Sequence, residues 1–155
     1  MQGSTEVLDA LNNVYHCLVS CEAQAHLQEH YLESEGWGGS KYWDEIETKV
    51  HTKCTHKILD RMFALGGSPT FELGFEVKYH RDDFSSAISE TVVSLEHCET
   101  SIQSAVDAAE ADGDCVTECL LYKCLKLIEG QICKFEGLAK RFGAIGPIVM
   151  TGDLD

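Results

Sequence analysis

The chain has 155 residues and carries 26 Asp and Glu against 12 Lys and Arg, which gives a formal net charge of −14. This length suits one domain of about 100–200 residues with a single core. The excess of negative charge argues against nucleic acids and anionic membrane surfaces as partners and favours cations.

Four long segments without a proline predict helices, because the chain has only 2 prolines, Pro69 and Pro147. In chain order the predicted helices cover residues 5–34, 42–65, 82–111 and 115–141, and Gly-rich turns separate them. Asp82 and Asp114 are expected N-caps, and Gly66 and Gly113 suit the C-terminal ends of the preceding helices. The predicted bundle covers residues 1–145, and residues 146–155 form a tail.

The start of the chain has no basic segment before its apolar residues, and no apolar run reaches the roughly 18 residues of a membrane span. These features predict a cytoplasmic protein. The chain has 8 cysteines, and in a reducing compartment these are free thiols that either pack as small apolar groups or bind soft metals.

Each predicted helix has an apolar stripe at a spacing of three and four residues, and each stripe includes a cysteine. The stripes are Val7, Leu11, Val14, Leu18, Cys21 and Ala25; Val50, Cys54, Ile58, Met62 and Leu65; Phe84, Ala87, Thr91, Leu95, Cys98, Ile102 and Ala105; and Val116, Leu120, Cys124, Leu127, Gln131, Phe135 and Leu138. Four such stripes predict an all-α four-helix bundle. The connection of about 15 residues between the second and third helices is long enough to cross the bundle, which makes those two helices parallel, as in ferritin-like folds.

The chain resembles bacterioferritins, the bacterial branch of the ferritin family. The segments that carry the resemblance are "MQGSTEVLDALNN" at the start, the "EGWGG" turn, "HKILDRMFALGGSP" at the end of the second helix and "EGQI" in the fourth. The resemblance implies an oligomer, either dimers or a 24-subunit shell. The tail "GPIVMTGDLD" replaces the short fifth helix of the family.

The resemblance also implies a di-iron centre of glutamates and histidines, but this chain has other residues at the matching positions. Those residues are Leu18, His51, Cys54, Ser94, Ile128 and Gln131. Two iron ions need several carboxylate oxygens, so ferroxidase activity is not expected. Thr52 stands at the position of the family's haem-ligating methionine, so a haem is not expected either.

Cysteines cluster near the level of this missing centre. From a rise of about 1.5 Å per residue, Cys17, Cys54, Cys98 and Cys124 fall just to one side of it, and Cys21, His51 and Cys133 fall to the other. Thiolates from separate helices suit a [4Fe-4S] cluster, Cu(I) or Zn(II). The seven residues are therefore candidate metal ligands, with packing as the alternative interpretation, and Cys115 and Cys119 form a further pair four residues apart.

The first helix also presents His16, His26 and His30 with Glu22, Glu29 and Glu33, which form either a metal path or a solvated charged face. The sequence thus favours a non-ferroxidase, ferritin-like oligomer that binds or stores a thiophilic metal, with an iron-sulfur cluster as the first choice and Cu(I) storage as the alternative. A structural subunit that co-assembles with an active bacterioferritin is the third hypothesis.

Overall fold

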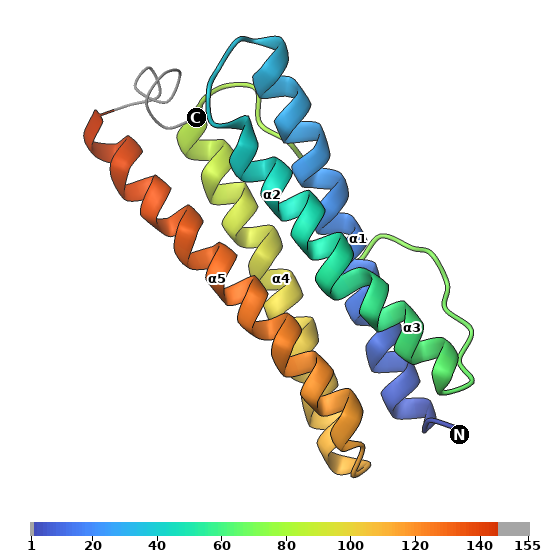
Figure 1. Ribbon diagram of the computed structural model, residues 1–155. Helices are drawn as coiled ribbons and strands as arrows, with labels where there is room; N and C mark the ends of the chain where they lie inside the picture. Colours follow the sequence, from blue (N-terminus) through green and yellow to red (C-terminus); the bar gives the residue numbers. More distant parts are fainter. Residues whose placement is uncertain (1, 146–155) are drawn as a thin grey trace.

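The computed structural model describes residues 2–145, and its side chains up to residue 142. It contains α1 (Thr5–Ser34), α2 (Ser40–Val50), a π-helical turn η1 (His51–Thr55), α3 (His56–Ala64), α4 (Phe84–Ala111) and α5 (Cys115–Ile145). Because α2, η1 and α3 continue one another, they form one rod, and with α1, α4 and α5 they make a four-helix bundle (Figure 1). The predicted all-α bundle is confirmed, and the predicted tail at 146–155 lies outside the described residues.

The helix ends follow the predicted capping residues with one difference. Gly66 and Gly113 have φ values of 79° and 68°, the left-handed conformation that closes a helix. Asp114 caps α5 by accepting a hydrogen bond from the Thr117 N–H at 3.1 Å. The cap of α4 is Asp83 and not Asp82, because the Asp83 carboxylate accepts the Ser86 N–H at 2.6 Å.

The long connection between α3 and α4 runs along α1 in the direction of that helix, so α4 is parallel to the α2–α3 rod as predicted (Figure 1). Polar side chains spaced four residues apart on α1 hold it in place. Asn12 and His16 bond Thr70, Ser20 bonds the Gly74 N–H, Gln24 bonds the Lys78 N–H, and Gln28 bonds the backbone of His80. This ladder satisfies backbone groups that would otherwise lack partners in a structureless segment.

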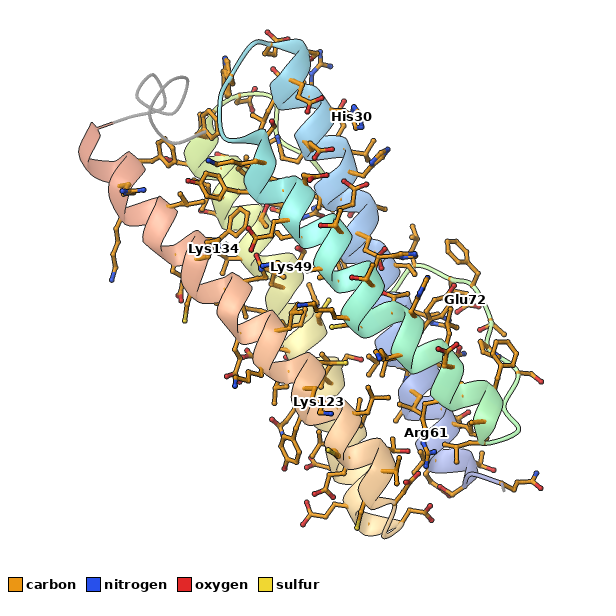
Figure 2. All side chains as sticks on the ribbon, in the orientation of Figure 1. His30, Lys49, Arg61, Glu72, Lys123 and Lys134 are labelled. Atoms are coloured by element: carbon orange, nitrogen blue, oxygen red, sulfur yellow. The ribbon has the colours of Figure 1, made fainter. Side chains whose placement is uncertain are left out.

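The predicted apolar stripes are confirmed on the first three rods, where each of the residues named is buried. On α5 the stripe is wrong at its start: Val116 is 62% exposed, whereas Thr117 and Leu121 are fully buried. The face of α5 with Val116 and the face with Leu121 both carry apolar residues, so the sequence alone did not show which face is buried. Arg61 of α3 favours burial of the face with Thr117. Its Nε donates to Thr117 Oγ1 at 2.9 Å, and its guanidinium pairs with Asp114 at 3.0 Å (Figure 2).

The core has an aromatic end and a thiol-rich middle. Trp43, Phe84 and Phe135 pack together at one end, and Trp43 Nε1 donates to Thr91 Oγ1 at 2.8 Å. Within the described part of the chain, no helix is both long and apolar enough to cross a membrane.

Candidate metal centre

Each of the four rods places one cysteine in the core. Cys21 of α1, Cys54 of η1, Cys98 of α4 and Cys124 of α5 have relative exposures of 0–1%. All the cysteines of the chain are free thiols. Four buried thiols from four separate helices form the cysteine layer, the name used here for these residues.

The thiols of the cysteine layer interact in two pairs. The neighbouring Cys21 side chain together with burial raises the pKa of Cys98 well above its usual value. In the same way, the Cys124 side chain and burial raise the pKa of Cys54. The Cys54 side chain and the charge of Lys57 lower the pKa of Cys124, against the effect of burial. Cys54 is close enough to Cys21 and Cys98 to be coupled to both electrostatically, so the two pairs adjoin.

Cys17 lies at the edge of this layer. Its side chain is half-buried, and burial raises its pKa although the neighbouring Ser101 hydroxyl acts in the opposite direction. The backbone carbonyl of Cys17 accepts a hydrogen bond from the Cys98 thiol at 3.4 Å. The helix therefore turns Cys21, not Cys17, towards the other three rods.

The spacing of the sulfurs bears on the kind of metal that fits. Among the described residues, no three cysteine sulfurs lie within 4.8 Å of one another. A single Zn(II) with thiolate ligands needs four sulfurs each about 2.3 Å from the ion. A polynuclear cluster has metal ions between its ligands and so holds the sulfurs farther apart. The described cysteines therefore form no ready-made mononuclear site of three or more sulfurs.

His51 points away from the cysteine layer. Half of its side chain is exposed, and Nδ1 lies 2.8 Å from the Glu22 carboxylate. The turn η1 explains this position, because a π-helix bonds residues five apart and so aligns His51 with His56, whose rings are 4.4 Å apart. The extra residue of that turn also buries both Cys54 and Thr55. The regular spacing of apolar residues on either side did not reveal this turn.

The remaining cysteines are on the surface. Cys133 is exposed, and so are Cys115 and Cys119. The latter two line a groove of about 430 Å³ together with Lys53, Lys57 and Lys123. The structure brings none of these three thiols into the cysteine layer.

The positions that resemble the di-iron ligand positions of ferritins do not fit a carboxylate-bridged centre. Leu18 and Ile128 are fully buried and apolar, and Ser94 donates its hydroxyl to the Thr91 carbonyl at 2.8 Å. Gln131 donates to Glu45 at 3.1 Å, and its Oε1 atom has no hydrogen-bond partner. Thr52 donates to the Thr48 carbonyl at 2.8 Å and offers no soft axial ligand to a haem.

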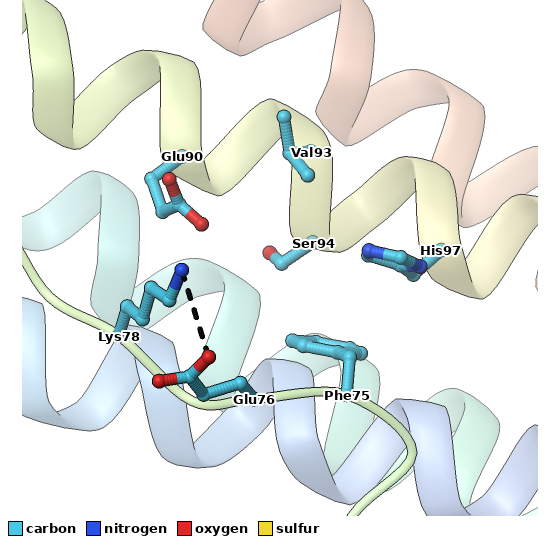
Figure 3. Close-up of a pocket in the computed structure, with 7 residues that line it drawn as sticks. All are labelled: Phe75, Glu76, Lys78, Glu90, Val93, Ser94 and His97. Carbon is cyan, nitrogen blue, oxygen red and sulfur yellow. Dashed lines mark ion pairs between the residues drawn. The ribbon is translucent and has the colours of Figure 1, made fainter.

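A small pocket lies outside the cysteine layer, between the long connection and α4. It has a volume of about 200 Å³ and is lined by Phe75, Glu76, Lys78, Glu90, Val93, Ser94 and His97 (Figure 3). The rings of Phe75 and His97 stack at 4.9 Å, and Lys78 pairs with Glu76 at 3.6 Å. Ser94 joins this pocket to the layer, because its Oγ lies 3.7 Å from Cys21 Sγ.

Comparison with known proteins identifies the fold. No family model matches the sequence, and no curated protein matches it either. A solved structure of Rhodobacter capsulatus bacterioferritin, described with a metal-free dinuclear site and a haem iron, is similar with a TM-score of 0.89 at 17% identity. The match covers 97% of this chain and 94% of that one. The chain therefore has the ferritin-like fold of a bacterioferritin, with cysteines in the part of the bundle where that resemblance implies carboxylates.

Proposed function

We propose that this chain is a non-ferroxidase, ferritin-like protein that binds a thiophilic metal in its bundle. The observation that carries the proposal is the cysteine layer: Cys21, Cys54, Cys98 and Cys124 are buried, adjacent and supplied by four different rods. Thiolates are soft ligands that favour Cu(I), Zn(II) and iron-sulfur clusters over hard ions. The negative net charge of the chain also favours cations as cargo.

An iron-sulfur cluster is the first choice. A [4Fe-4S] cluster takes one thiolate from each of four cysteines, which is the number that the layer provides. The absence of a mononuclear three-sulfur site among the described residues is compatible with a polynuclear guest. Loss of the thiol protons on binding would remove the high pKa of Cys54 and Cys98, since the metal stabilises the thiolates.

Cu(I) storage is the second candidate, because several Cu(I) ions bridged by thiolates also fit a layer without a three-sulfur mononuclear site. The surface thiols Cys115 and Cys119 would extend that capacity, and Cys17 and Cys133 are further sulfur ligands for it. The groove beside Lys53, Lys57 and Lys123 would attract an anionic carrier of the metal. His51 has no part in either centre in its present orientation.

Anaerobic purification followed by elemental analysis tests the proposal. Iron and sulfide together with a band near 400 nm that bleaches on reduction support the cluster, and several Cu(I) per chain in a colourless protein support copper storage. Cys98→Ser should abolish either one, whereas Cys133→Ser, which changes an exposed thiol, should leave it unchanged. A protein that binds neither metal under reducing conditions would contradict the proposal and favour a structural subunit that uses its cysteines for packing.

We also propose that the chain works as an oligomer. Phe63, Phe71 and Leu73 are 64%, 71% and 57% exposed near the end of α3 and the start of the long connection. Large apolar side chains gathered on a surface mark association sites. Light scattering tests this: a dimer or a shell supports it, and a monomer at micromolar concentration contradicts it. Co-purification with a tagged bacterioferritin would identify co-assembly.

A further inference from the structure

A second group of ligand side chains lies in the seam between α1 and α2, outside the cysteine layer. The ligand atoms of His26, Glu29 and His30 are within 4.8 Å of one another, and so are those of Glu29, Asp44 and Glu47. Glu29 belongs to both sets. The two sets therefore form one continuous cluster around a single carboxylate.

Helix geometry explains why these residues meet. His26, Glu29 and His30 are three and four residues apart on α1, and Asp44 and Glu47 are three apart on α2, so each group lies on one face of its helix. The two helices are antiparallel neighbours, and their faces meet at the seam (Figure 1). The His26 Nδ1 atom lies 2.6 Å from the Glu47 carboxylate, which joins the two helices directly.

Glu29 is the feature that points to a ligand. Its relative exposure is 8%, yet among the described residues no Lys or Arg pairs with it, and the His30 ring is 3.8 Å away. The ligand oxygens of Asp44 and Glu47 lie within 4.8 Å of the Glu29 carboxylate, so three acidic side chains meet here. A cation beside a carboxylate that is buried among other acids offsets the cost of burying its charge.

We propose that His26, Glu29, His30, Asp44 and Glu47 form a second metal site, which binds a divalent first-row transition-metal ion with Glu29 as its central ligand. Imidazole ligands suit zinc, iron and nickel, and carboxylates suit manganese and other hard ions, so a mixed set fits Mn(II), Fe(II) or Zn(II). The thiol layer prefers softer metals, which makes the two sites chemically distinct. This inference does not depend on the metal centre proposed for the cysteine layer.

Mn(II) is the appropriate probe, because thiols compete poorly for it and its free ion has a strong electron paramagnetic resonance signal. The full chain is first treated with a chelator. We then expect it to bind added Mn(II) and so to remove the free-ion signal, with saturation near one Mn(II) per chain. Glu29→Gln should weaken binding at least tenfold. His97→Gln, which removes an exposed histidine elsewhere, should leave the affinity unchanged, and Cys54→Ser should leave it unchanged too.

His30→Gln provides a second variant on an exposed side chain, in case Glu29→Gln alters the fold, and it too should weaken Mn(II) binding. Thermal unfolding gives an independent readout: Mn(II) should raise the melting temperature of the wild type and of His97→Gln, but not that of Glu29→Gln. Equal Mn(II) affinity in the wild type and both cluster variants would overturn the proposal. Displacement of Mn(II) by an equal concentration of Mg(II) would also overturn it, because imidazole ligands would then play no part.

Discussion

Cys21 Sγ lies 3.7 Å from Ser94 Oγ, so a thiol of α1 contacts the α4 residue that stands where the resemblance to ferritins implies a glutamate. Ser94 is 3% exposed, and its hydroxyl also donates to the Thr91 carbonyl. The Ser94 hydroxyl thus lies against a sulfur and a backbone carbonyl, and the residue also lines the small pocket beside the long connection.

Ser94→Glu should destabilise the metal-free protein by about 1–3 kcal/mol, because the longer side chain does not fit beside Cys21 and places a second carboxylate next to Glu90 of the adjoining pocket. It should not confer oxidation of Fe(II), since Leu18 and Ile128 still provide no ligand. Urea unfolding and an absorbance assay of iron oxidation measure the two effects. Ser94→Ala, the control, should cost about 1 kcal/mol for its lost hydrogen bond. A stable, iron-oxidising Ser94→Glu protein would show that the site still accommodates hard metals.

Gly74→Ala should displace the long connection. A Cβ atom at Gly74 would lie 2.7 Å from the Cys17 backbone nitrogen and 2.9 Å from its Cα and Sγ atoms. The backbone of α1 cannot move away from it without breaking the helix. We expect a loss of about 1–3 kcal/mol and faster reaction of Cys17 with a thiol reagent. Gly130→Ala is the matched control, because a Cβ there meets nothing within 4 Å and should stabilise the helix by about 0.5–1 kcal/mol. Unchanged stability of Gly74→Ala would mean that the connection does not pack on Cys17 as described.

Glu45 should contribute stability that depends on pH. Burial disfavours its charge, but hydrogen bonds from Lys134, Gln131 and Lys49 outweigh burial and lower its pKa from 4.5 to about 2 (Figure 2). The unfolded chain therefore binds more protons than the folded one between these values. The stabilisation is complete above pH 4.5 and is lost as the pH falls through about 2. A quarter of the side chain is exposed, so we expect about 1–2 kcal/mol.

Glu45→Gln should accordingly lower the free energy of unfolding at pH 7 and lose that deficit near pH 2, as measured by urea unfolding across this range. Glu136→Gln, which removes the same charge from an exposed position on α5, should show no such loss. Equal pH profiles for the two variants would mean that Glu45 gains nothing from its three donors.

Arg61 should determine how α5 begins. Its guanidinium bonds both Asp114 and Thr117, and Asp114 has a lowered pKa because its bonds with Thr117 and the charge of Arg61 outweigh burial. Arg61→Met should cost about 1–3 kcal/mol, since it leaves the capping carboxylate without its cation. Hydrogen exchange should increase in the first turns of α5 and remain unchanged at the far end. Protection in those first turns equal to that of the wild type would indicate that Thr117 and Leu121 maintain the register alone.

Local spacing by itself determined much of this protein. The four rods, their glycine ends and the buried positions on α1, the α2–α3 rod and α4 follow from a period near 3.6 and from chain breakers, which act within a few residues. The length of the connection after α3 determined the parallel crossover. The presence of a cysteine on each stripe could likewise be read from the sequence.

Tertiary structure alone decided the rest. The choice of Cys21 over Cys17, the outward turn of His51 through a π-helix, the register of α5 and the meeting of His26 and Glu29 with Asp44 and Glu47 depend on neighbours distant in sequence. The physical reason is that periodicity gives a residue's height and approximate face, whereas a rotation of a fraction of a turn, set by packing between rods, decides which side chains touch. A metal site depends on differences of about an ångström, and these arise only when the rods are packed together.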